Sequence, residues 1–337
     1  MSSHPVESTQ FLAGPAPSGF QGRDLISVAD FNPQEIKEIL AMAALMKAHP
    51  AEFRSALAGK QIVMFFEKPS LRTRLTFEAG AGSLGGQAIF VDQTHGRMDA
   101  RESLSDIAHN VERWVDGIVL RTFAHATVEG MAQYASIPVI NALSEREHPC
   151  QALADYLTLQ ERFGDLRKIT LAYVGDGNNV THSLLLAGAA LGSRIRVATP
   201  AGFGPDPAIV HLARETARKT GAVIELLSAA RAAVEGADAV YTDAWTSMGQ
   251  EREAARREKV FPPYQVNDKL MAAAAPHAIF MHCLPAHRGQ EATNAVMDSP
   301  QSVIFDQAEN RLHVQKAILM LLLGGKQNRL PVRSAHA

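Results

Sequence analysis

The sequence has little cysteine, few aromatic residues and no long apolar run. Its 337 residues include only two cysteines, Cys150 and Cys283, which excludes a disulfide scaffold and a cysteine-rich zinc site. The longest apolar run, residues 317–323, is far shorter than the roughly 20 residues that span a bilayer. The chain does not open with a basic segment followed by an apolar one, as a signal peptide does. We therefore expect a cytoplasmic protein with no membrane partner.

Charge of one sign is not in excess either. The 33 Lys and Arg residues nearly balance the 35 Asp and Glu residues, which gives a formal net charge of −2. A protein that binds nucleic acid through its phosphates normally carries a clear basic excess, so we expect no nucleic-acid partner. The length is sufficient for about two domains, each with a sizeable core.

Apolar segments typical of buried strands alternate with segments of helical periodicity over most of the chain. This alternation predicts an α/β protein with parallel sheets. The pattern restarts after residues 153–167, which predicts two doubly wound parallel-sheet domains of similar size, linked by long helices. The expected strands are residues 61–66, 88–91, 117–120, 137–140, 169–174, 194–198, 223–227, 239–241 and 278–281, and the main helices begin near residues 33, 70, 148, 179 and 312.

The predicted domain boundaries follow from this restart. Residues 1–22 have no period and are expected to form a flexible tail. Residues 23–152 form the first predicted domain, which a C-terminal helix at about residues 312–330 completes. Residues 153–311 form the second.

A basic turn, Ser-Leu-Arg-Thr-Arg at residues 70–74, follows the first predicted strand. Ser70 is a good N-cap, and the first turn of a helix offers unpaired N–H groups at the positive end of the helix dipole. Arg72, Thr73 and Arg74 would add to an anion site at the carboxyl end of a parallel strand, where α/β proteins bind ligands. The alternative is a solvated basic turn, although its cations would oppose the dipole.

A second motif, His-Pro-Cys-Gln at residues 148–151, stands where another strand gives way to a helix. His148 could donate a hydrogen bond to a carbonyl or oxyanion, and Gln151 could hold an amide. The alternative is an ordinary polar helix start with a satisfied histidine.

The turn Gly-Asp-Gly-Asn-Asn at residues 175–179 follows a strand and opens a helix, as dinucleotide-binding turns do. Val180 stands where the fingerprint requires its third glycine, so the match is incomplete. Two interpretations remain open at this point: a nucleotide-dependent dehydrogenase, or a polar turn that holds the charged end of a substrate.

Another strand ends at Asp-Ala-Trp-Thr-Ser-Met-Gly, residues 243–249, and leads into the densely charged segment 250–259. A loop this polar, with Gly249 as a hinge, could close over a ligand. For the charged segment alone, a surface helix with paired charges is the alternative.

The last motif is His-Cys-Leu-Pro-Ala-His-Arg-Gly at residues 282–289, again after a strand. Cys283 could be a reactive thiolate, a polar pivot or an inert buried thiol. His282 and His287 have no third and fourth ligand at a fitting spacing, so the sequence predicts no metal site.

Taken together and in this order, the motifs resemble those of the carbamoyltransferase family, and most closely those of its ornithine-accepting members. Residues 70–74 resemble the carbamoyl phosphate loop and residues 148–151 the His-Pro-x-Gln motif. Residues 243–249 and 282–285 resemble two ornithine-type signatures, and the aspartate-accepting relatives lack the Ser-Met-Gly loop. The resemblance covers about residues 22–330. It implies transfer of the carbamoyl group of carbamoyl phosphate to the δ-amine of ornithine, without cofactor or metal, in a homotrimer or a multiple of trimers.

The resemblance also implies roles for individual residues. The first domain would bind carbamoyl phosphate and the second ornithine, and the catalytic residues would be Arg121, His148, Asp243 and Cys283. The residues implied for carbamoyl phosphate are Ser70, Leu71 (through its backbone), Arg72, Thr73, Arg121, His148, Gln151, Cys283, Leu284 and Arg311, and those for ornithine are Asn179, Asp243, Ser247 and Met248.

Two positions depart from the family pattern. Leu71 stands where the phosphate loop often has threonine, which removes a hydroxyl group but keeps the backbone N–H. Arg97 stands where many ornithine enzymes have glutamine, in a segment (residues 96–103) that resembles the loop reaching a neighbouring subunit. The alternatives are a carbamoyltransferase for N-acetylornithine, N-succinylornithine or putrescine, or a non-catalytic small-molecule-binding protein on the same fold.

Overall fold

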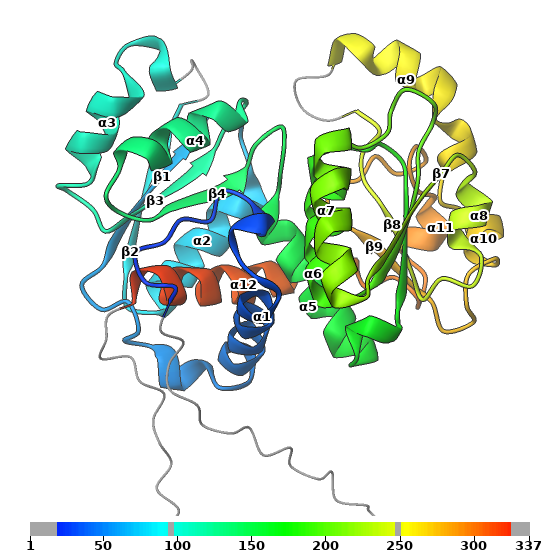
Figure 1. Ribbon diagram of the computed structural model, residues 1–337, viewed down its shortest axis with the longest axis horizontal. Coiled ribbons are helices and arrows are strands. Elements are labelled where there is room, and N and C mark those ends of the chain that lie inside the picture. Colours follow the sequence, from blue (N-terminus) through cyan, green and yellow to red (C-terminus); the bar gives the residue numbers. More distant parts are fainter. Residues whose placement is uncertain (1–18, 94–97, 247–250, 325–337) are drawn as a thin grey trace, which may run out of the picture.

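The computed structural model describes residues 19–93, 98–246 and 251–324, which form two α/β halves lying side by side (Figure 1). Each half is built on one sheet, and every strand pair in both sheets is parallel. The two sheets confirm the predicted α/β class with two doubly wound parallel sheets.

The first sheet has the strand order β2-β1-β3-β4. The chain goes from β1 to β2 on one side and then crosses to β3 on the other side of β1, so the switch point of the sheet lies between β1 and β3. The carboxyl ends of these two strands lie together, because Phe66 pairs with Arg121. Ligands of open α/β sheets bind at such a switch point. The strands are β1 (Gln61–Phe66), β2 (Gln87–Asp92), β3 (Gly117–Arg121) and β4 (Val139–Leu143), and the helices that follow them include α2 (Leu71–Ser83), α3 (Leu104–Val111) and α4 (His125–Tyr134).

The second sheet has the order β7-β6-β5-β8-β9, with its switch point between β5 and β8. Thr242 pairs with His282, so the segments after β8 and β9 leave the sheet side by side. The strands are β5 (Thr170–Val174), β6 (Arg194–Ala198), β7 (Val223–Leu227), β8 (Ala239–Thr242) and β9 (Ile279–His282), and the helices are α6 (Asn179–Leu191), α7 (Pro207–Thr220), α8 (Ala230–Val234), α9 (Ala254–Val260), α10 (Asp268–Met271) and α11 (Asn294–Met297).

Three long helices join the halves: α1 (Pro33–Ala48), α5 (Pro149–Phe163) and α12 (Ile304–Leu323). Helix α12 packs against α1, α2 and α5, and α5 also packs against α6 of the second half (Figure 1). One buried apolar cluster runs from Ile62 in β1 to Tyr173 in β5 through these helices. Helices α5 and α12 therefore belong to a core that the two halves share. Short 3-10 helices lie at Val28–Asp30, Pro50–Phe53, Met98–Ala100, Leu166–Lys168, Glu251–Glu253 and Pro262–Tyr264.

Most element starts agree with local sequence signals. Asn32 caps α1 in a capping box with Glu35, and Ser70 caps α2 by accepting the Thr73 N–H. Strand β4 begins two residues later than predicted, after Pro138, which has no N–H to donate to a neighbouring strand.

The predicted start of the closing helix near residue 312 is wrong, because α12 begins at Ile304. Its first turns carry Gln307, Asn310 and Arg311, which are polar yet buried, and their partners lie on α5 and α2. Apolar periodicity does not reveal a helix whose inner face is polar. No helix among the described residues is both long and apolar enough to cross a membrane.

Candidate active site

The basic turn after β1 lies against two further arginines. The Ser70 hydroxyl bonds the Thr73 hydroxyl at 3.0 Å, and Thr73 Oγ1 accepts Arg311 Nη2 at 3.0 Å and Arg121 Nη1 at 3.5 Å. Arg121 ends β3 and Arg311 comes from α12, about 240 residues along the chain from Thr73 in sequence. The fold therefore gathers donors from α2, β3 and α12 around one hydroxyl group.

The cluster carries positive charge in a buried place. Burial, together with the nearby charges of Arg311 and Arg72, lowers the pKa of Arg121 to about 9. Burial likewise lowers the pKa of Arg72 and of Arg311. Within the described part of the chain, Arg121 Nε and Arg311 Nε are buried without a hydrogen-bond partner. Like charges with unused donors make a site for a compact anion with several oxygens.

Two residues of this turn, Leu71 and Arg74, have side chains that do not belong to the cluster. Arg74 pairs with Glu78 at 2.9 Å and its guanidinium lies 3.8 Å from the centroid of the Phe90 ring, so the sequence interpretation that added Arg74 to the anion site is wrong. Leu71 is 69% exposed, so the site can use its backbone but not its side chain.

His148 and Gln151, at the start of α5, reach the same cluster. The pKa of His148 lies well below its ordinary value because of burial, with Arg311 and Arg121 adding to the effect, so the imidazole is neutral. Its Nδ1 is buried without a partner among the described residues. Gln151 Oε1 accepts Arg311 Nη1 at 2.7 Å, which fixes the amide beside the arginines.

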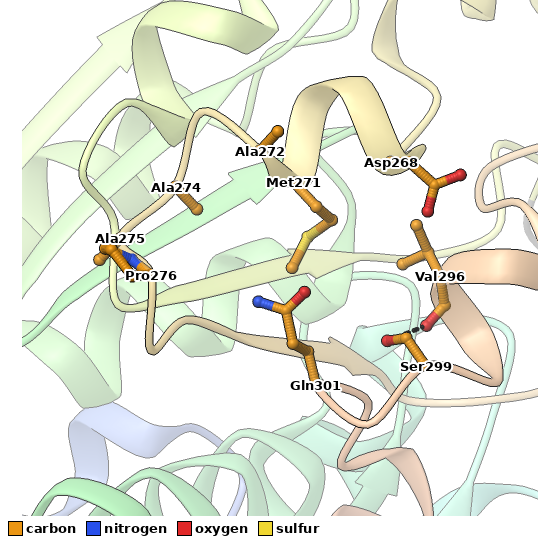
Figure 2. A pocket seen from close by; sticks show the side chains of 9 residues that line it. All are labelled: Asp268, Met271, Ala272, Ala274, Ala275, Pro276, Val296, Ser299 and Gln301. Carbon is orange, nitrogen blue, oxygen red and sulfur yellow. Dashed lines mark hydrogen bonds between the residues drawn. The ribbon is translucent and has the colours of Figure 1, made fainter.

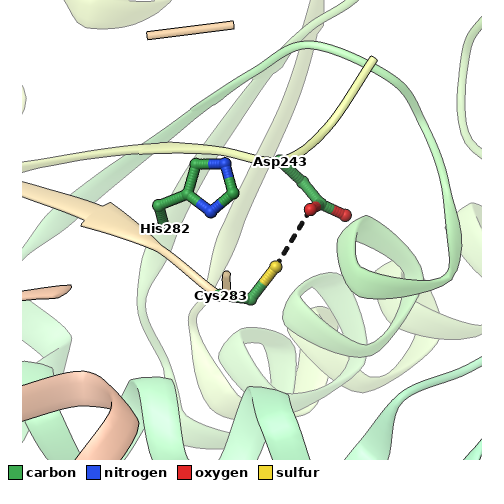
Figure 3. Close-up of side chains that lie close together, drawn as sticks. All are labelled: Asp243, His282 and Cys283. Carbon is green, nitrogen blue, oxygen red and sulfur yellow. Dashed lines mark hydrogen bonds between the residues drawn. The ribbon is translucent and has the colours of Figure 1, made fainter. Parts of the chain in front are cut away.

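On the facing side, Asp243 follows β8 and Cys283 follows β9. The Cys283 thiol donates to Asp243 Oδ1 at 3.0 Å (Figure 3), and Asn178 Nδ2 donates to Asp243 Oδ2 at 2.7 Å. Burial first, and then the adjacent Asp243, raise the pKa of Cys283 well above its ordinary value. Cys283 is thus a protonated hydrogen-bond donor, and the thiolate alternative is disfavoured.

Leu284 turns the chain away from this pair. Its φ of 59° lies in the left-handed region, which is uncommon for a residue with a side chain. The Leu284 N–H donates to His282 Nδ1 at 2.9 Å, and His282 Nε2 lies 3.1 Å from Glu291 Oε1. Both residues of this buried His–Glu pair are fully enclosed, so the turn has a rigid support.

The fold brings Asp243 next to His282 and Cys283, with one potential ligand atom of each within 4.8 Å (Figure 3). The sequence interpretation weighed His282 and His287 alone, because 39 residues separate Asp243 from His282 in the chain. The His287 side chain is 55% exposed and lies 4.0 Å from Glu291, away from this group. Both ring nitrogens of His282 already have protein partners, so a metal ion would have to displace one of them.

A cavity of about 460 Å³ lies between the two halves, and Asn178, the hydrogen-bond partner of Asp243, lines it. Asn179, the residue predicted for a substrate, lines it and donates to the Ser144 carbonyl at 2.6 Å. Asn178, which sequence reasoning missed, also lines it. The missed signal was its N-cap position on α6, where Asn178 Oδ1 accepts two backbone N–H groups. The residues that line this cavity include Lys68, Phe123 and Glu145 from the first half and Asp176, Asn178, Asn179, His182, Phe203 and Arg257 from the second.

The charged segment 251–259 is not simply a surface helix. Arg257 is buried and donates to Asp176 Oδ2 and to the Trp245 carbonyl, both at 2.7 Å. The expectation of solvated paired charges is therefore wrong for Arg257. Burial raises the pKa of Asp176 to about 6, and Arg257 opposes this rise.

The turn at Gly177 also decides against a dinucleotide site. A Cβ atom at Gly177 would lie 2.3 Å from the Gly204 backbone, and the Gly177 N–H already donates to the Phe203 carbonyl at 2.8 Å, so this N–H is not free for a pyrophosphate. Asp176 and Asn178 are likewise committed to Arg257 and Asp243.

Ser247 and Met248, predicted for the substrate, lie outside the described residues, as does Arg97. A second cavity, of about 410 Å³, is lined by residues of α10 and α11 and of the segments beside them (Figure 2), and none of its lining residues is a predicted site residue. Among the described residues that line it, Asp268 is the one ionisable group, and alanines make up much of the wall. This cavity therefore lacks the many charged groups that line the first cavity.

Two family profiles together match nearly the whole described chain. Residues 23–161 match the carbamoyl-P binding domain of aspartate/ornithine carbamoyltransferase, and residues 167–322 match its Asp/Orn binding domain.

Individual relatives agree with the family profiles. An ornithine carbamoyltransferase from Symbiobacterium thermophilum is 52% identical over 90% of this chain and 98% of its own, and one from Thermococcus kodakarensis is 49% identical over 90% and 97%. The solved structure of the Pyrococcus furiosus ornithine carbamoyltransferase has a TM-score of 0.89 at 47% identity, covering 92% of this chain and 99% of that one.

Proposed function

The chain belongs to the aspartate/ornithine carbamoyltransferase family, and from this premise we propose that it transfers the carbamoyl group of carbamoyl phosphate to the δ-amine of L-ornithine, giving L-citrulline and phosphate. The observation that carries the proposal is that a basic cluster and an acidic pair lie opposite each other. Buried arginines with unused donors face a buried Asp243–Cys283 pair, as a dianionic donor and a cationic acceptor require.

Carbamoyl phosphate binds on the first side. Arg72 and Arg121 hold the phosphate oxygens together with Ser70, Thr73 and the N–H groups of the first turn of α2, and Arg311 closes the pocket from α12. The buried positions of Arg121 and Arg311 support this assignment, because a bound dianion repays the burial of their charges. Leu71 contributes its N–H.

The carbonyl end points to α5. His148 is neutral, so one ring nitrogen can donate a hydrogen bond to the carbonyl oxygen where negative charge develops. Arg121 and Thr73 donate to the same oxygen, and Gln151 holds the carbamoyl amide. One such donor is worth about 3 kcal/mol of transition-state stabilisation.

Ornithine binds from the second side. Asp243 takes the α-ammonium group, and Asn179 with Ser247 and Met248 takes the rest of the amino-acid end. Cys283 and Leu284 lie beside the reacting atoms. The side-chain amine must be neutral to attack, although a free amine of this kind has a pKa of roughly 10. Desolvation between the two halves favours the neutral amine.

In the chemical step, the lone pair of the δ-nitrogen forms the new C–N bond at the carbonyl carbon. The C–O bond to phosphate then breaks and phosphate leaves with the electron pair. The proton that the nitrogen loses ends on the phosphate, which is released as hydrogen phosphate. Phosphate is a good leaving group, so the arrangement needs no metal or organic cofactor. Holding both substrates in line removes a large entropic part of the barrier.

The free α-ammonium group is the feature that selects among amines. An N-acylated ornithine would offer Asp243 an uncharged amide, and putrescine would leave the amino-acid contacts unused. N-acetylornithine, N-succinylornithine and putrescine are therefore the substrates to test against ornithine.

The same proposal covers organisation and assembly. Residues 23–152 with the C-terminal helix form the carbamoyl phosphate domain, and residues 153–311 form the ornithine domain. The enzyme is a homotrimer or a multiple of trimers, which the exposed Leu71, Leu75 and Ile89 on α2 and the edge strand β2 support. The cytoplasm suits its two free thiols.

A steady-state assay with purified protein tests the function. Incubation with carbamoyl phosphate and each amine in turn should form a carbamoylated product from ornithine at a kcat/KM at least about tenfold above that with any other amine. Citrulline formation no faster than the spontaneous reaction would refute the proposal, and a preference for an acylated amine would correct the substrate.

A further inference from the structure

Asp155 is a buried carboxyl group on α5 that none of the motifs includes. Its Oδ1 accepts Gln151 Nε2 at 2.8 Å and Gln307 Nε2 at 2.7 Å, and its Oδ2 accepts Tyr241 OH at 3.0 Å. The residue is fully buried, and so are its three partners. All three hydrogen bonds come from neutral donors, which is an unusual environment for a carboxylate.

The three partners lead to different parts of the active site. Gln151 Oε1 accepts from Arg311, so this partner reaches the arginine cluster. Gln307 Oε1 accepts the backbone N–H of His282 at 2.9 Å, one residue before Cys283. Tyr241 lies on β8 two residues before Asp243, and its ring stacks on Tyr173 of β5 with 5.7 Å between centroids.

We propose that Asp155 is a positioning residue that joins the two halves of the active site. Its carboxyl group sets the Gln151 amide on the carbamoyl phosphate side, and through Tyr241 and Gln307 it sets the ends of β8 and β9 on the ornithine side. The inference deepens the proposed function and rests on it for the identity of the two ligands. Occupancy of the arginine cluster is thereby communicated to the Asp243–Cys283 pair.

The chain of contacts is short and continuous. Arg311 holds Gln151, Gln151 holds Asp155, and Asp155 holds both Gln307 and Tyr241. A ligand that binds Arg311 shifts or fixes the Gln151 amide. The Asp155 carboxyl group follows this change, because each of its oxygens is already held by a hydrogen bond. Burial raises the pKa of Asp155 to about 7, and the hydrogen bonds from Gln151, Gln307 and Tyr241 oppose this rise.

A purely structural role would tie α5 to α12 without linking ligands, and the chain offers a matched control for it. Thr158 lies one turn further along α5, is equally buried, and accepts Asn310 Nδ2 of α12 at 2.9 Å. Replacing Thr158 by Val removes a buried bond between the same two helices outside the chain of contacts that leads to the active site.

The test measures binding of two unreactive ligands to the full-length protein. L-norvaline is ornithine without its terminal amine, and phosphonoacetamide is carbamoyl phosphate with CH₂ in place of the bridging oxygen. The coupling ratio is the Kd of norvaline alone divided by its Kd in saturating phosphonoacetamide, measured by calorimetry. Wild-type protein should give a ratio of at least about 10, within the range of typical couplings between sites.

Three substitutions then separate positioning from packing. Asp155→Leu should bring the ratio close to 1. Asp155→Asn should retain most of it, because one amide oxygen can still accept from both glutamines and the Tyr241 hydroxyl can turn to accept. Tyr241→Phe deletes a single oxygen and should lower the ratio about fivefold, while the Kd of phosphonoacetamide alone stays within about twofold.

These measurements distinguish coupling through Asp155 from packing between the two helices. A wild-type ratio near 1, or an unchanged ratio in a folded Asp155→Leu or Tyr241→Phe protein, overturns the proposal. An equal loss in Thr158→Val also overturns it, because packing alone would then explain the effect. If Asp155→Leu does not fold, Tyr241→Phe decides. Absence of citrulline formation by the wild type would count against the function and not against the coupling, which is measured without turnover.

Discussion

The arginine cluster of the first half and the Asp243–Cys283 pair of the second half are prepared for their ligands in opposite ways. In the first, positive charges are buried together and two guanidinium Nε atoms have no partner among the described residues. In the second, Asp243 is already satisfied by Asn178, Cys283 and the Ala244 N–H. The first side therefore gains hydrogen bonds when it binds an anion, whereas the second must exchange existing ones. This difference favours binding of carbamoyl phosphate before ornithine.

The largest effect should come from the buried arginines. Arg121→Met should lower kcat/KM at least about a thousandfold, because both the phosphate and the carbonyl oxygen lose the positive guanidinium group that stabilises them. The melting temperature should stay the same or rise, since the variant relieves repulsion with Arg311 and Arg72. Arg74→Gln, on the outward face of the same turn region, should change kcat/KM less than about threefold. Similar losses in both variants would contradict the assignment of the cluster.

The second side should respond through ornithine alone. Asp243→Ala should raise the KM for ornithine about a hundredfold, because the α-ammonium group loses a buried charged partner. The Kd of phosphonoacetamide should remain within about twofold of the wild type, since the arginine side is left intact. An equal weakening of both ligands would show that the two sides are not distinct.

A carboxyl group at the junction of the halves links stability to pH. Glu147 Oε2 accepts the Val28 N–H and the Ser183 hydroxyl, both at 3.1 Å, and burial raises the pKa of Glu147 to about 7. The folded protein therefore holds a proton that the unfolded chain has lost, so stability should fall as pH rises from about 4.5 to about 7. Glu147→Gln should remove up to about 3 kcal/mol of this decline, measured by urea unfolding at pH 5 and pH 8. An identical pH dependence in the variant would refute the shift.

Arg257 should affect the second side at a distance. Arg257→Met leaves Asp176 buried without its cation, and should raise the KM for ornithine about tenfold while hardly changing that for carbamoyl phosphate. Arg256→Met is the matched control, because the neighbouring arginine also lies over the Phe203 ring but is exposed. If the two variants behave alike, the buried pair has no special part in positioning.

The smallest effect belongs to the departure in the phosphate loop. Leu71→Thr restores the more usual hydroxyl, yet the side chain at this position is 69% exposed. The KM for carbamoyl phosphate should change less than about twofold. A larger gain would mean that the side chain turns inward when the anion binds.

The sequence predicts the strands and the motif positions well, because both are local. Apolar runs bounded by polar turns mark β1 and β6 to the residue, and Ser70 marks the start of α2. The parallel direction of the strands places all their carboxyl ends at one edge of the sheet, whereas the pairing of β1 with β3 is seen in the structure alone.

The missing parts depend on contacts between distant segments. The polar start of α12 is helical because its side chains meet α5, and Arg257 is buried because Asp176 lies 81 residues away in sequence but in contact. The approach of Asp243 to His282 and the three partners of Asp155 likewise come from tertiary packing. No local pattern encodes these distances.

The most direct test of the central claim is a crystal structure with a bisubstrate analogue, in which the δ-nitrogen of ornithine carries a phosphonoacetyl group. We predict the phosphonate oxygens within hydrogen-bond distance of Arg72 and Arg121, and the α-ammonium group on Asp243. A phosphonate bound elsewhere, with the arginine cluster unchanged, would contradict the account.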